Sequence, residues 1–161
     1  MREILEILEK DARTTPEEIA RILRKKVNVV KNTIRKLERE GVIVKYKTVI
    51  NRELIKDEAR AVRALIEVRV SPERGYGFDH IAERIYRFPE VLSCYLLSGS
   101  YDLLLLVEGK DIHDVSHFVA ERLATLENVR STVTHFLLKK YKEDGDILKR
   151  RERNKRIVIS F

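Results

Sequence analysis

The sequence predicts an α+β protein of two parts, a small helical part followed by a larger part that contains a β-sheet. Two patterns support this prediction. Apolar residues recur at helical spacing through the first 40 residues, whereas beyond residue 60 they form short strand-like runs separated by two further helical stretches. The length of 161 residues suits one ordinary domain or two small ones, and 43% hydrophobic residues can build packed cores.

Two helices are expected at the start of the chain. Residues 2–10 place isoleucines and leucines on one side and charges elsewhere. The second helix starts at a capping signal, because Thr15 can cap it, Pro16 suits its first position, and two acids follow. A short break at residues 24–26 ends it. We expect this helix to bury Ile19, Ala20, Ile22 and Leu23.

The third helix is the most informative element of the first part. It begins at Val27 or Asn28 and runs to Glu40, where Gly41 ends it. One side is apolar and should face the core, whereas the opposite side carries bases and amides with no acid at its centre. Asparagine pairs with adenine, and lysine or arginine with guanine, in a major groove that admits one α-helix. The core side comprises Val27, Val30, Ile34 and Leu37, and the basic side comprises Lys25, Asn28, Val29, Asn32, Lys36 and Arg39, with Arg35 at its margin.

A β-branched stretch over residues 42–50 follows this helix and is typical of one or two strands. Two helices, a tight turn and a third basic helix form a helix-turn-helix, and a strand after it suggests a wing with Lys45 and Lys47 near phosphate. The alternative is a solvated charged face, which most charge runs are. In this context we predict a winged helix-turn-helix that binds double-stranded DNA.

The charge distribution supports a polyanionic partner for the first part. Residues 1–52 carry 14 Lys and Arg against 8 Asp and Glu, whereas residues 53–140 carry 12 against 14. The purest apolar run, Leu103–Val107, is too short to span a bilayer, and the acids near the N-terminus do not suit a signal peptide. A single cysteine excludes an internal disulfide. We therefore expect a soluble cytoplasmic protein with no membrane partner.

The second part has the order β-α-β-β-α-β, which is that of a ferredoxin-like fold. A hairpin at Ser98, Gly99 and Ser100 joins the two middle strands, and Asp111 caps the second helix. Strands are expected over residues 61–70, 91–97, 101–108 and 129–140, and helices over residues 78–88 and from residue 111 to about residue 123. The expected core comprises Val62, Ala64, Ile66, Val68, Val70, Phe78, Ile81, Ala82, Ile85, Ile112, Val115, Phe118, Val119 and Leu123.

One face of this sheet is predicted to meet a second subunit. Both helices of a ferredoxin-like fold cover the same face, so the other face should be polar where it meets water. Leu103–Val107 shows no alternation, and strands that are apolar on both sides are buried on both sides.

With these residues in place, the chain resembles the Lrp/AsnC family, the feast/famine transcription regulators of bacteria and archaea. The resemblance covers nearly all of the first 140 residues. It rests on residues 34–43 followed by Tyr46, on residues 88–91, on residues 98–103 and on residues 129–134. These pieces are weak singly, but their order and spacing are fairly specific.

The resemblance implies binding to operator DNA as a homodimer, with dimers that can assemble into tetramers or octamers. It also implies that the second part binds an amino acid or a similar small effector between subunits. Backbone N–H groups at a glycine turn can hold a carboxylate, and Asp102 can pair with an α-ammonium group. The effector residues implied are Gly99, Ser100, Tyr101, Asp102, Ser131, Thr132 and Thr134.

Structural roles are the alternative for these residues. Gly99 suits an ordinary hairpin turn, Asp102 can cap that turn, and threonines are common in strands. Two features depart from the family pattern. The third helix lacks the usual Ser or Thr cap before Val27, and residues 145–161 extend beyond the part that can be matched. That tail can be disordered, pair as an edge strand or contact phosphate.

The domain boundaries follow from these assignments. They are a DNA-binding domain at residues 1–51, a linker at residues 52–60, a sensing and oligomerisation domain at residues 61–141 and a basic tail at residues 142–161.

Other functional groupings are weaker. His113 and His117 have a spacing that can chelate a metal, but a third ligand is not evident, so we predict neither a metal site nor a cofactor. Cys94 is expected in the core. Tetrapyrrole-modifying decarboxylases are similar in their two-domain plan, which makes such an enzyme the alternative function. We predict a regulator that is not an enzyme, because the basic face of the third helix has no role in that chemistry.

Overall fold

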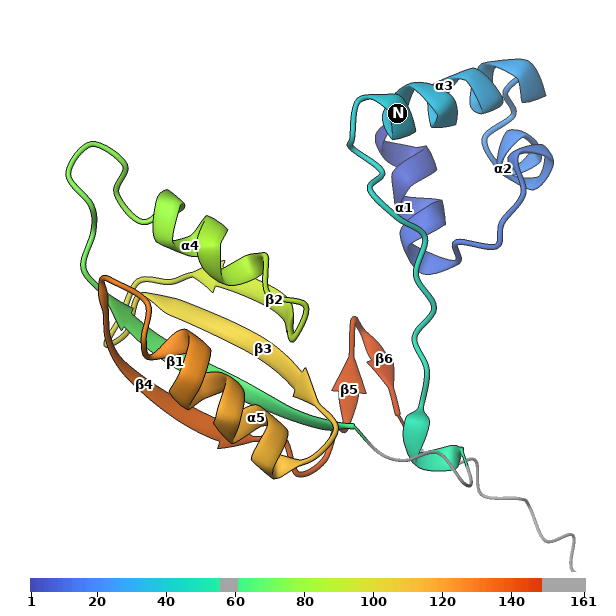
Figure 1. The fold of residues 1–161 in the computed structure, drawn as a ribbon. Coiled ribbons are helices and arrows are strands. Elements are labelled where there is room, and N and C mark those ends of the chain that lie inside the picture. The colour runs from blue at the N-terminus through green and yellow to red at the C-terminus, as the bar shows by residue number, and fades with distance from the viewer. Residues whose placement is uncertain (56–60, 149–161) are drawn as a thin grey trace, which may run out of the picture. The chain divides into compact units, whose positions relative to one another are not determined.

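The computed structural model describes residues 1–55 and 61–148, and the chain divides into two compact units, Met1–Ile50 and Asn51–Phe161 (Figure 1). We call the first unit the head and the second the body. Residues 56–60 of the expected linker and residues 149–161 of the expected tail lie outside the described residues.

The head contains the three expected helices, α1 (Arg2–Lys10), α2 (Pro16–Ile22) and α3 (Val27–Arg39). Thr15 and Glu18 form a capping box at the start of α2, with Pro16 in its first turn, as predicted. Helical spacing puts one apolar residue per turn on the inner side of each helix, and these residues pack together. The buried residues of the head are Ile4, Ile19, Ala20, Val30, Ile34 and Leu37.

Two details of the head differ from the sequence prediction, and a third agrees with it. Ile22 was expected in the core, but it is 61% exposed because the last turn of α2 presents it outward. The strands predicted over residues 42–50 do not form, and this stretch is irregular chain. The start of α3 lacks a side-chain cap at Lys26, as the sequence indicated.

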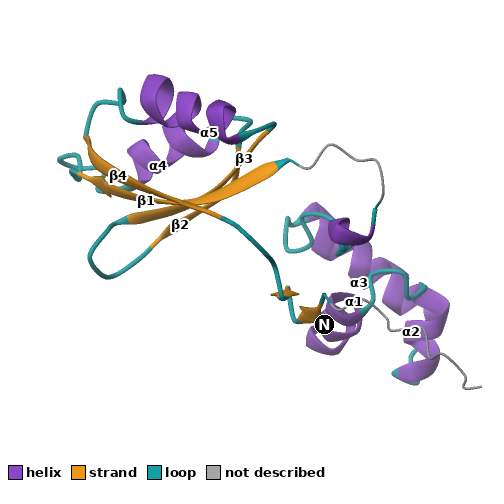
Figure 2. Ribbon diagram, turned by 90° about the horizontal axis from the view of Figure 1, so that it is seen from below, coloured by secondary structure: helices purple, strands orange, loops and turns teal. Residues whose placement is uncertain are grey.

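The body is a four-stranded antiparallel sheet with two helices on one face, which confirms the predicted order of elements (Figure 2). The strand order is β2-β3-β1-β4. Further elements are a short 3₁₀ turn at Arg52–Leu54, a π-helical turn at Val119–Leu123, and a hairpin of β5 (Lys142–Glu143) and β6 (Asp146–Ile147). The main elements are β1 (Val62–Val70), α4 (Asp79–Tyr86), β2 (Val91–Leu96), β3 (Leu103–Gly109), α5 (Ile112–Phe118) and β4 (Val129–Phe136).

The core of the body lies between the sheet and the helices. Every second residue of β1 and β3 is buried there, and Ile81, Ile85, Val115 and Phe118 close it from the helices. Ile112 was expected in this core, but it is 53% exposed, because it occupies the first position of α5.

Among the described residues of the body, no helix lies over the opposite face of the sheet (Figure 2). Leu65, Leu104 and Leu106 are half-buried on this open face. Tyr95 is 54% exposed there, and Val133 is 50% exposed. A second subunit on this face stays a prediction.

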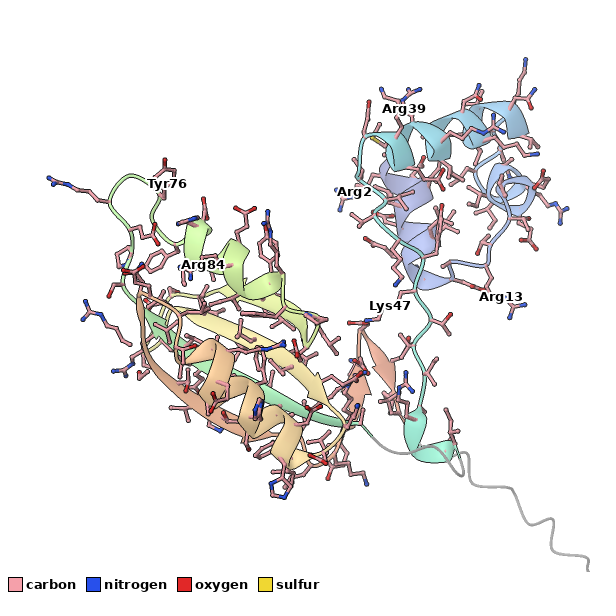
Figure 3. All side chains as sticks on the ribbon, viewed as in Figure 1. Arg2, Arg13, Arg39, Lys47, Tyr76 and Arg84 are labelled. Atoms are coloured by element: carbon pink, nitrogen blue, oxygen red, sulfur yellow. The ribbon has the colours of Figure 1, made fainter. Side chains whose placement is uncertain are left out.

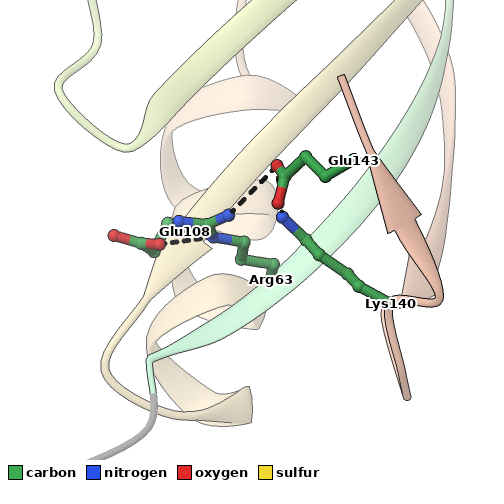
Figure 4. A network of polar contacts seen from close by, with 4 residues as sticks. All are labelled: Arg63, Glu108, Lys140 and Glu143. Carbon is green, nitrogen blue, oxygen red and sulfur yellow. Dashed lines mark hydrogen bonds and ion pairs between the residues drawn. The ribbon is translucent and has the colours of Figure 1, made fainter. Parts of the chain in front are cut away.

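One end of the open face carries a network of charged residues (Figure 4). The Arg63 guanidinium contacts both Glu108 and Glu143, and the Lys140 Nζ lies 2.6 Å from Glu143 Oε1. The network joins the sheet to the β5–β6 hairpin, because Glu143 belongs to β5.

Candidate nucleic-acid interface and effector site

The outer side of α3 presents the residues that the sequence predicted for DNA contact. These residues are exposed because they lie opposite the buried stripe of Val30, Ile34 and Leu37. Even Val29 is 52% exposed, and Figure 3 shows Arg39 projecting from the last turn of the helix. We call this surface the α3 face; its members are Asn28, Val29, Asn32, Arg35, Lys36 and Arg39.

The residues of the α3 face differ in how far they are already paired. Asn32, Arg35 and Arg39 make no hydrogen bond or ion pair with the residues that the structure describes. Lys36 forms only a loose pair with Glu40, with 3.8 Å between Nζ and Oε1. An exposed pair at that distance contributes little and is readily exchanged for a phosphate.

Lys25 is already paired within the head. Its Nζ lies 2.7 Å from Glu3 Oε2 of α1, and this hydrogen bond holds the pKa of the Glu3 carboxyl below its ordinary value. Lys25 therefore serves first to connect α1 with the turn before α3.

The chain after α3 is held against that helix. The backbone N–H groups of Val42 and Ile43 both donate to the Leu37 carbonyl oxygen. The Tyr46 hydroxyl donates to Glu38 Oε1 at 2.9 Å, and burial together with this contact raises the pKa of Tyr46. Lys45 and Lys47, on either side of Tyr46, are both exposed. Sequence reasoning missed the anchoring role of Tyr46, because an eight-residue separation gives no periodic signal.

The predicted effector residues lie partly together. Asp102, at the start of β3, is bound to the end of β1: its backbone N–H donates to the Val68 carbonyl, and its Oδ2 accepts from the Val70 N–H at 2.8 Å. The hairpin of Gly99 and Ser100 beside it is exposed. We call this region, where β1 ends, β4 begins and the β2–β3 hairpin turns, the sheet end (Figure 1).

The β4 residues lie on the other side of β1 and on two faces. Ser131 pairs with Arg69, and Thr132 pairs with Val68, so both are near the sheet end. Thr134 pairs with Ile66, deeper in the sheet. Thr132 and Thr134 belong to the helix-covered face, because their partners on β1 are core residues.

The structure adds one cation to the sheet end that sequence reasoning missed. Arg130 lies at an irregularity in the pairing of β1 with β4, and its Nε donates to the Ser71 hydroxyl. The sequence carries no signal for this placement, because alternation alone cannot show where a strand gains an extra residue.

Two of the four histidines pair with an acid, and two are exposed on a helix. His80 pairs with Glu73, and His135 pairs with Glu67, whereas His113 and His117 are exposed on α5. Within residues 1–55 and 61–148, the structure shows no cluster of three potential metal ligands.

Two further findings concern the body's cysteine and the helices. Cys94 packs against the core of the body, as expected, and burial raises the pKa of its thiol. None of the helices that the structure describes has the length and apolar character needed to cross a membrane.

Comparisons with known proteins agree with this architecture. The family described as the Lrp/AsnC ligand binding domain matches residues 63–147, and the winged helix-turn-helix DNA-binding family matches residues 1–44. An uncharacterized HTH-type transcriptional regulator of Bacillus subtilis, YugG, is 49% identical over 158 residues, which is 98% of this chain and 95% of the relative.

Solved structures with the same fold include two complexes with an amino acid. The transcriptional regulator NMB0573 of Neisseria meningitidis, in complex with L-Met, is 26% identical, with a TM-score of 0.68 over 88% of this chain and 89% of the other. A feast or famine regulatory protein of M. tuberculosis complexed with L-methionine is also 26% identical, with a TM-score of 0.70 over 92% of this chain and 96% of the other.

Proposed function

Because this chain belongs to the Lrp/AsnC family of transcriptional regulators, we propose that it reads DNA sequence through the α3 face and that an amino acid bound at the sheet end modulates this binding. Residues 1–51, which comprise the head and Asn51, are then the DNA-binding domain, and residues 61–141 form the sensing domain. The observation that carries the DNA assignment is the α3 face, which is exposed, free of acids at its centre and largely unpaired.

We assign different tasks to the residues of the DNA interface. Asn28 and Asn32 suit hydrogen bonding to adenine, and Lys36 suits guanine, because these side chains lie on the outer side of α3. Val29 suits contact with a thymine methyl group. Phosphate contacts, which position a protein without reading sequence, are assigned to Lys25, Arg35, Arg39, Lys45 and Lys47.

The effector proposal rests on the sheet end. Two similar proteins were solved with L-methionine, and Asp102 offers a carboxylate oxygen for an ammonium group. The residues proposed for the site are Gly99, Ser100, Tyr101, Asp102, Ser131, Thr132 and Thr134. Thr132 and Thr134 lie on the helix-covered face of the sheet. They can therefore contact only a ligand that extends from the sheet end onto that face.

We further propose that the active species is a homodimer in the cytoplasm, with larger assemblies built from dimers. The open face supports dimer formation, because its leucines, Tyr95 and Val133 form an apolar surface that water would otherwise contact. The relatives' names support a regulator without catalytic activity. A haem-like compound added at micromolar concentration should leave its absorbance spectrum unchanged; a spectral shift would favour the enzyme alternative.

The decisive experiment identifies the DNA and then tests the α3 face. Purified full-length protein is used to select duplexes from genomic fragments, with and without amino acids, and fluorescence anisotropy then gives affinities for the selected and scrambled duplexes. Asn32→Ala and Lys36→Ala should each lose about 1–3 kcal/mol of preference for the selected duplex. Arg13→Ala is the matched control, because Arg13 is an exposed base of the head outside the α3 face (Figure 3). Unchanged preference in both α3 variants would remove these residues from sequence reading.

A further inference from the structure

We propose that Arg130 binds the carboxylate of the effector and, together with Asp102, selects a ligand that carries both charges of an α-amino acid. This inference rests on the proposed function, since it assumes that the sheet end is the effector site. It adds a specificity-determining residue that the resemblance did not supply.

Arg130 owes its position to a break in the strand pairing. Arg69 pairs with Ser131, but the next residue of β1, Val70, pairs with Val129, so Arg130 is an extra residue on β4. An extra residue of this kind bends its strand and redirects a side chain, and such bulges are frequent beside functional sites. Here the bulge places an arginine at the end of β1.

The guanidinium is fixed at its inner atom and free at its outer ones. Nε donates to the Ser71 hydroxyl, whereas the two terminal nitrogens make no hydrogen bond or ion pair with any residue that the structure describes. Ser71 is itself fixed, because its backbone N–H donates to the Asn128 carbonyl at 2.8 Å. An arginine held by Nε presents its terminal N–H groups as a fork that fits a carboxylate.

The acid of the loop after β1 is engaged by residues other than Arg130. Glu73 is the acid of the loop after β1, and both of its carboxylate oxygens are used, one by Asn128 Nδ2 at 2.9 Å and one by His80 Nδ1 at 2.7 Å. These contacts fasten the loop to the start of β4, and Arg130 forms no ion pair with an acid in the part of the chain that the structure describes.

Asp102 is held in the complementary way. Its Oδ2 accepts from the Val70 N–H, and its Oδ1 has no partner among the described residues. Val70, at the end of β1, lies between the two charged groups. Asp102 binds it from the β3 side. Val129, which precedes Arg130, pairs with it from the β4 side. The aspartate and the bulged residue thus lie on strands two apart in the sheet, separated by about 10 Å at the backbone.

This arrangement matches an α-amino acid better than a simple anion or cation. The proposal requires both side chains to reach over the end of β1, where Asp102 binds the Val70 N–H and Arg130 binds the Ser71 hydroxyl, so that one small molecule contacts both charges. Asp102 and Arg130 do not pair with each other. A zwitterion satisfies both, whereas an amine or an amide leaves the guanidinium without a carboxylate, which costs about tenfold or more in affinity per lost charge-assisted hydrogen bond.

The test compares acids with their amides on the full-length protein. The twenty common L-amino acids are screened by thermal shift, and the one that raises the melting temperature most is titrated calorimetrically against its α-amide. We expect wild type to prefer the acid about tenfold or more. Arg130→Gln should bind the acid and the amide equally and weakly. The matched control is Arg69→Gln, which removes a neighbouring charge from β1 and should keep the preference for the acid.

The outcomes separate this inference from the proposed function. If wild type binds an amino acid and Arg130→Gln keeps the full acid-over-amide preference, the assignment of Arg130 is overturned while effector binding stands. If none of the twenty amino acids binds to wild type, both are overturned. Ser71→Ala provides a second readout: loss of the anchor should weaken binding of the acid but retain some acid-over-amide preference, because the charge remains. Circular dichroism of each variant checks that the sheet is intact.

Discussion

The α3 face and the sheet end hold their polar and charged groups in opposite ways. On α3, Asn32, Arg35 and Arg39 are exposed and have no internal partner among the described residues. At the sheet end, Asp102 and Arg130 each have one atom fixed by a neighbouring strand or loop and one side left open. The difference is one of rigidity, because long free side chains can follow a phosphate backbone, whereas two anchored charges set a fixed spacing.

This contrast suits the two kinds of ligand. DNA offers a regular array of charges, so binding tolerates side-chain motion and depends strongly on salt. A small ligand offers two charges at one separation, so selectivity requires residues whose positions are fixed by their surroundings. The body supplies that rigidity through a continuous core beneath the sheet, and the first two predictions test how far the sheet end depends on it.

The largest effect is expected from a cavity under the sheet. Ile66 is completely buried at the centre of β1, so Ile66→Ala should lower the free energy of unfolding by about 2–5 kcal/mol. Urea denaturation followed by circular dichroism measures the loss. Ile112→Ala is the control, because Ile112 is 53% exposed and its truncation should cost about 0.5 kcal/mol or less. Similar losses in both variants would contradict the assignment of the core.

The next largest effect separates the structural and binding roles of Asp102. Asp102→Ala leaves the Val70 N–H without its acceptor and should cost about 1–3 kcal/mol of stability. Asp102→Asn keeps an oxygen acceptor but removes the charge, so its stability should stay close to that of wild type while amino-acid binding is lost. If Asp102→Asn binds the amino acid as wild type does, the carboxylate has only the capping role.

Apolar periodicity and helix-capping residues predicted most of the fold. α1 has the predicted bounds, Thr15 and Asp111 cap their helices as expected, and the β-α-β-β-α-β order from β1 to β4 along the chain is as predicted. These features are local, since apolar spacing and a capping side chain act within a few residues of each other. The predicted α3 face is likewise a local consequence of helical geometry, and its exposure follows from the buried stripe opposite.

Features that depend on distant neighbours were not predictable in the same way. Residues 42–50 have strand-like composition, but a strand needs a hydrogen-bonding partner, and the described chain provides none there. Ile22 and Ile112 fit the apolar pattern, yet they lie at helix ends where the core no longer reaches. The bulge at Arg130 depends on the register between β1 and β4, which residue spacing does not encode.

A third prediction concerns the free arginines of the α3 face. Arg35→Ala and Arg39→Ala should each weaken binding uniformly across DNA sequences and reduce the slope of log affinity against log salt by about 1. Anisotropy titrations between low and moderate salt measure the slope. Arg13→Ala, outside the α3 face, should leave it unchanged. Equal slopes for wild type and both α3 variants would mean that neither arginine contacts phosphate.

A smaller effect is expected at the turn between α2 and α3. Arg24 has a φ of 52°, a left-handed conformation that a side chain disfavours, so Arg24→Gly should stabilise the head by at most about 1 kcal/mol. Arg21→Gly makes the same change inside α2 and should destabilise by about 1 kcal/mol. Thermal denaturation of both variants compares the signs. Two losses of equal size would show that the turn is not strained.

The smallest effect concerns the α2 capping box and its dependence on pH. Hydrogen bonds from the Thr15 backbone and side chain to the Glu18 carboxylate lower the pKa of Glu18. A carboxyl whose pKa is lowered by folding contributes stability above its ordinary pKa, and this contribution is lost as pH falls through the lowered value. Glu18→Gln should therefore melt slightly below wild type at pH 7, and the difference should narrow at pH 3, because protonation of Glu18 increases as pH falls toward its lowered pKa. Because the variant differs only at this residue, the closing gap isolates Glu18 from the other acids. A gap that stays constant between the two pH values would show that the carboxylate charge has no part in holding the start of α2.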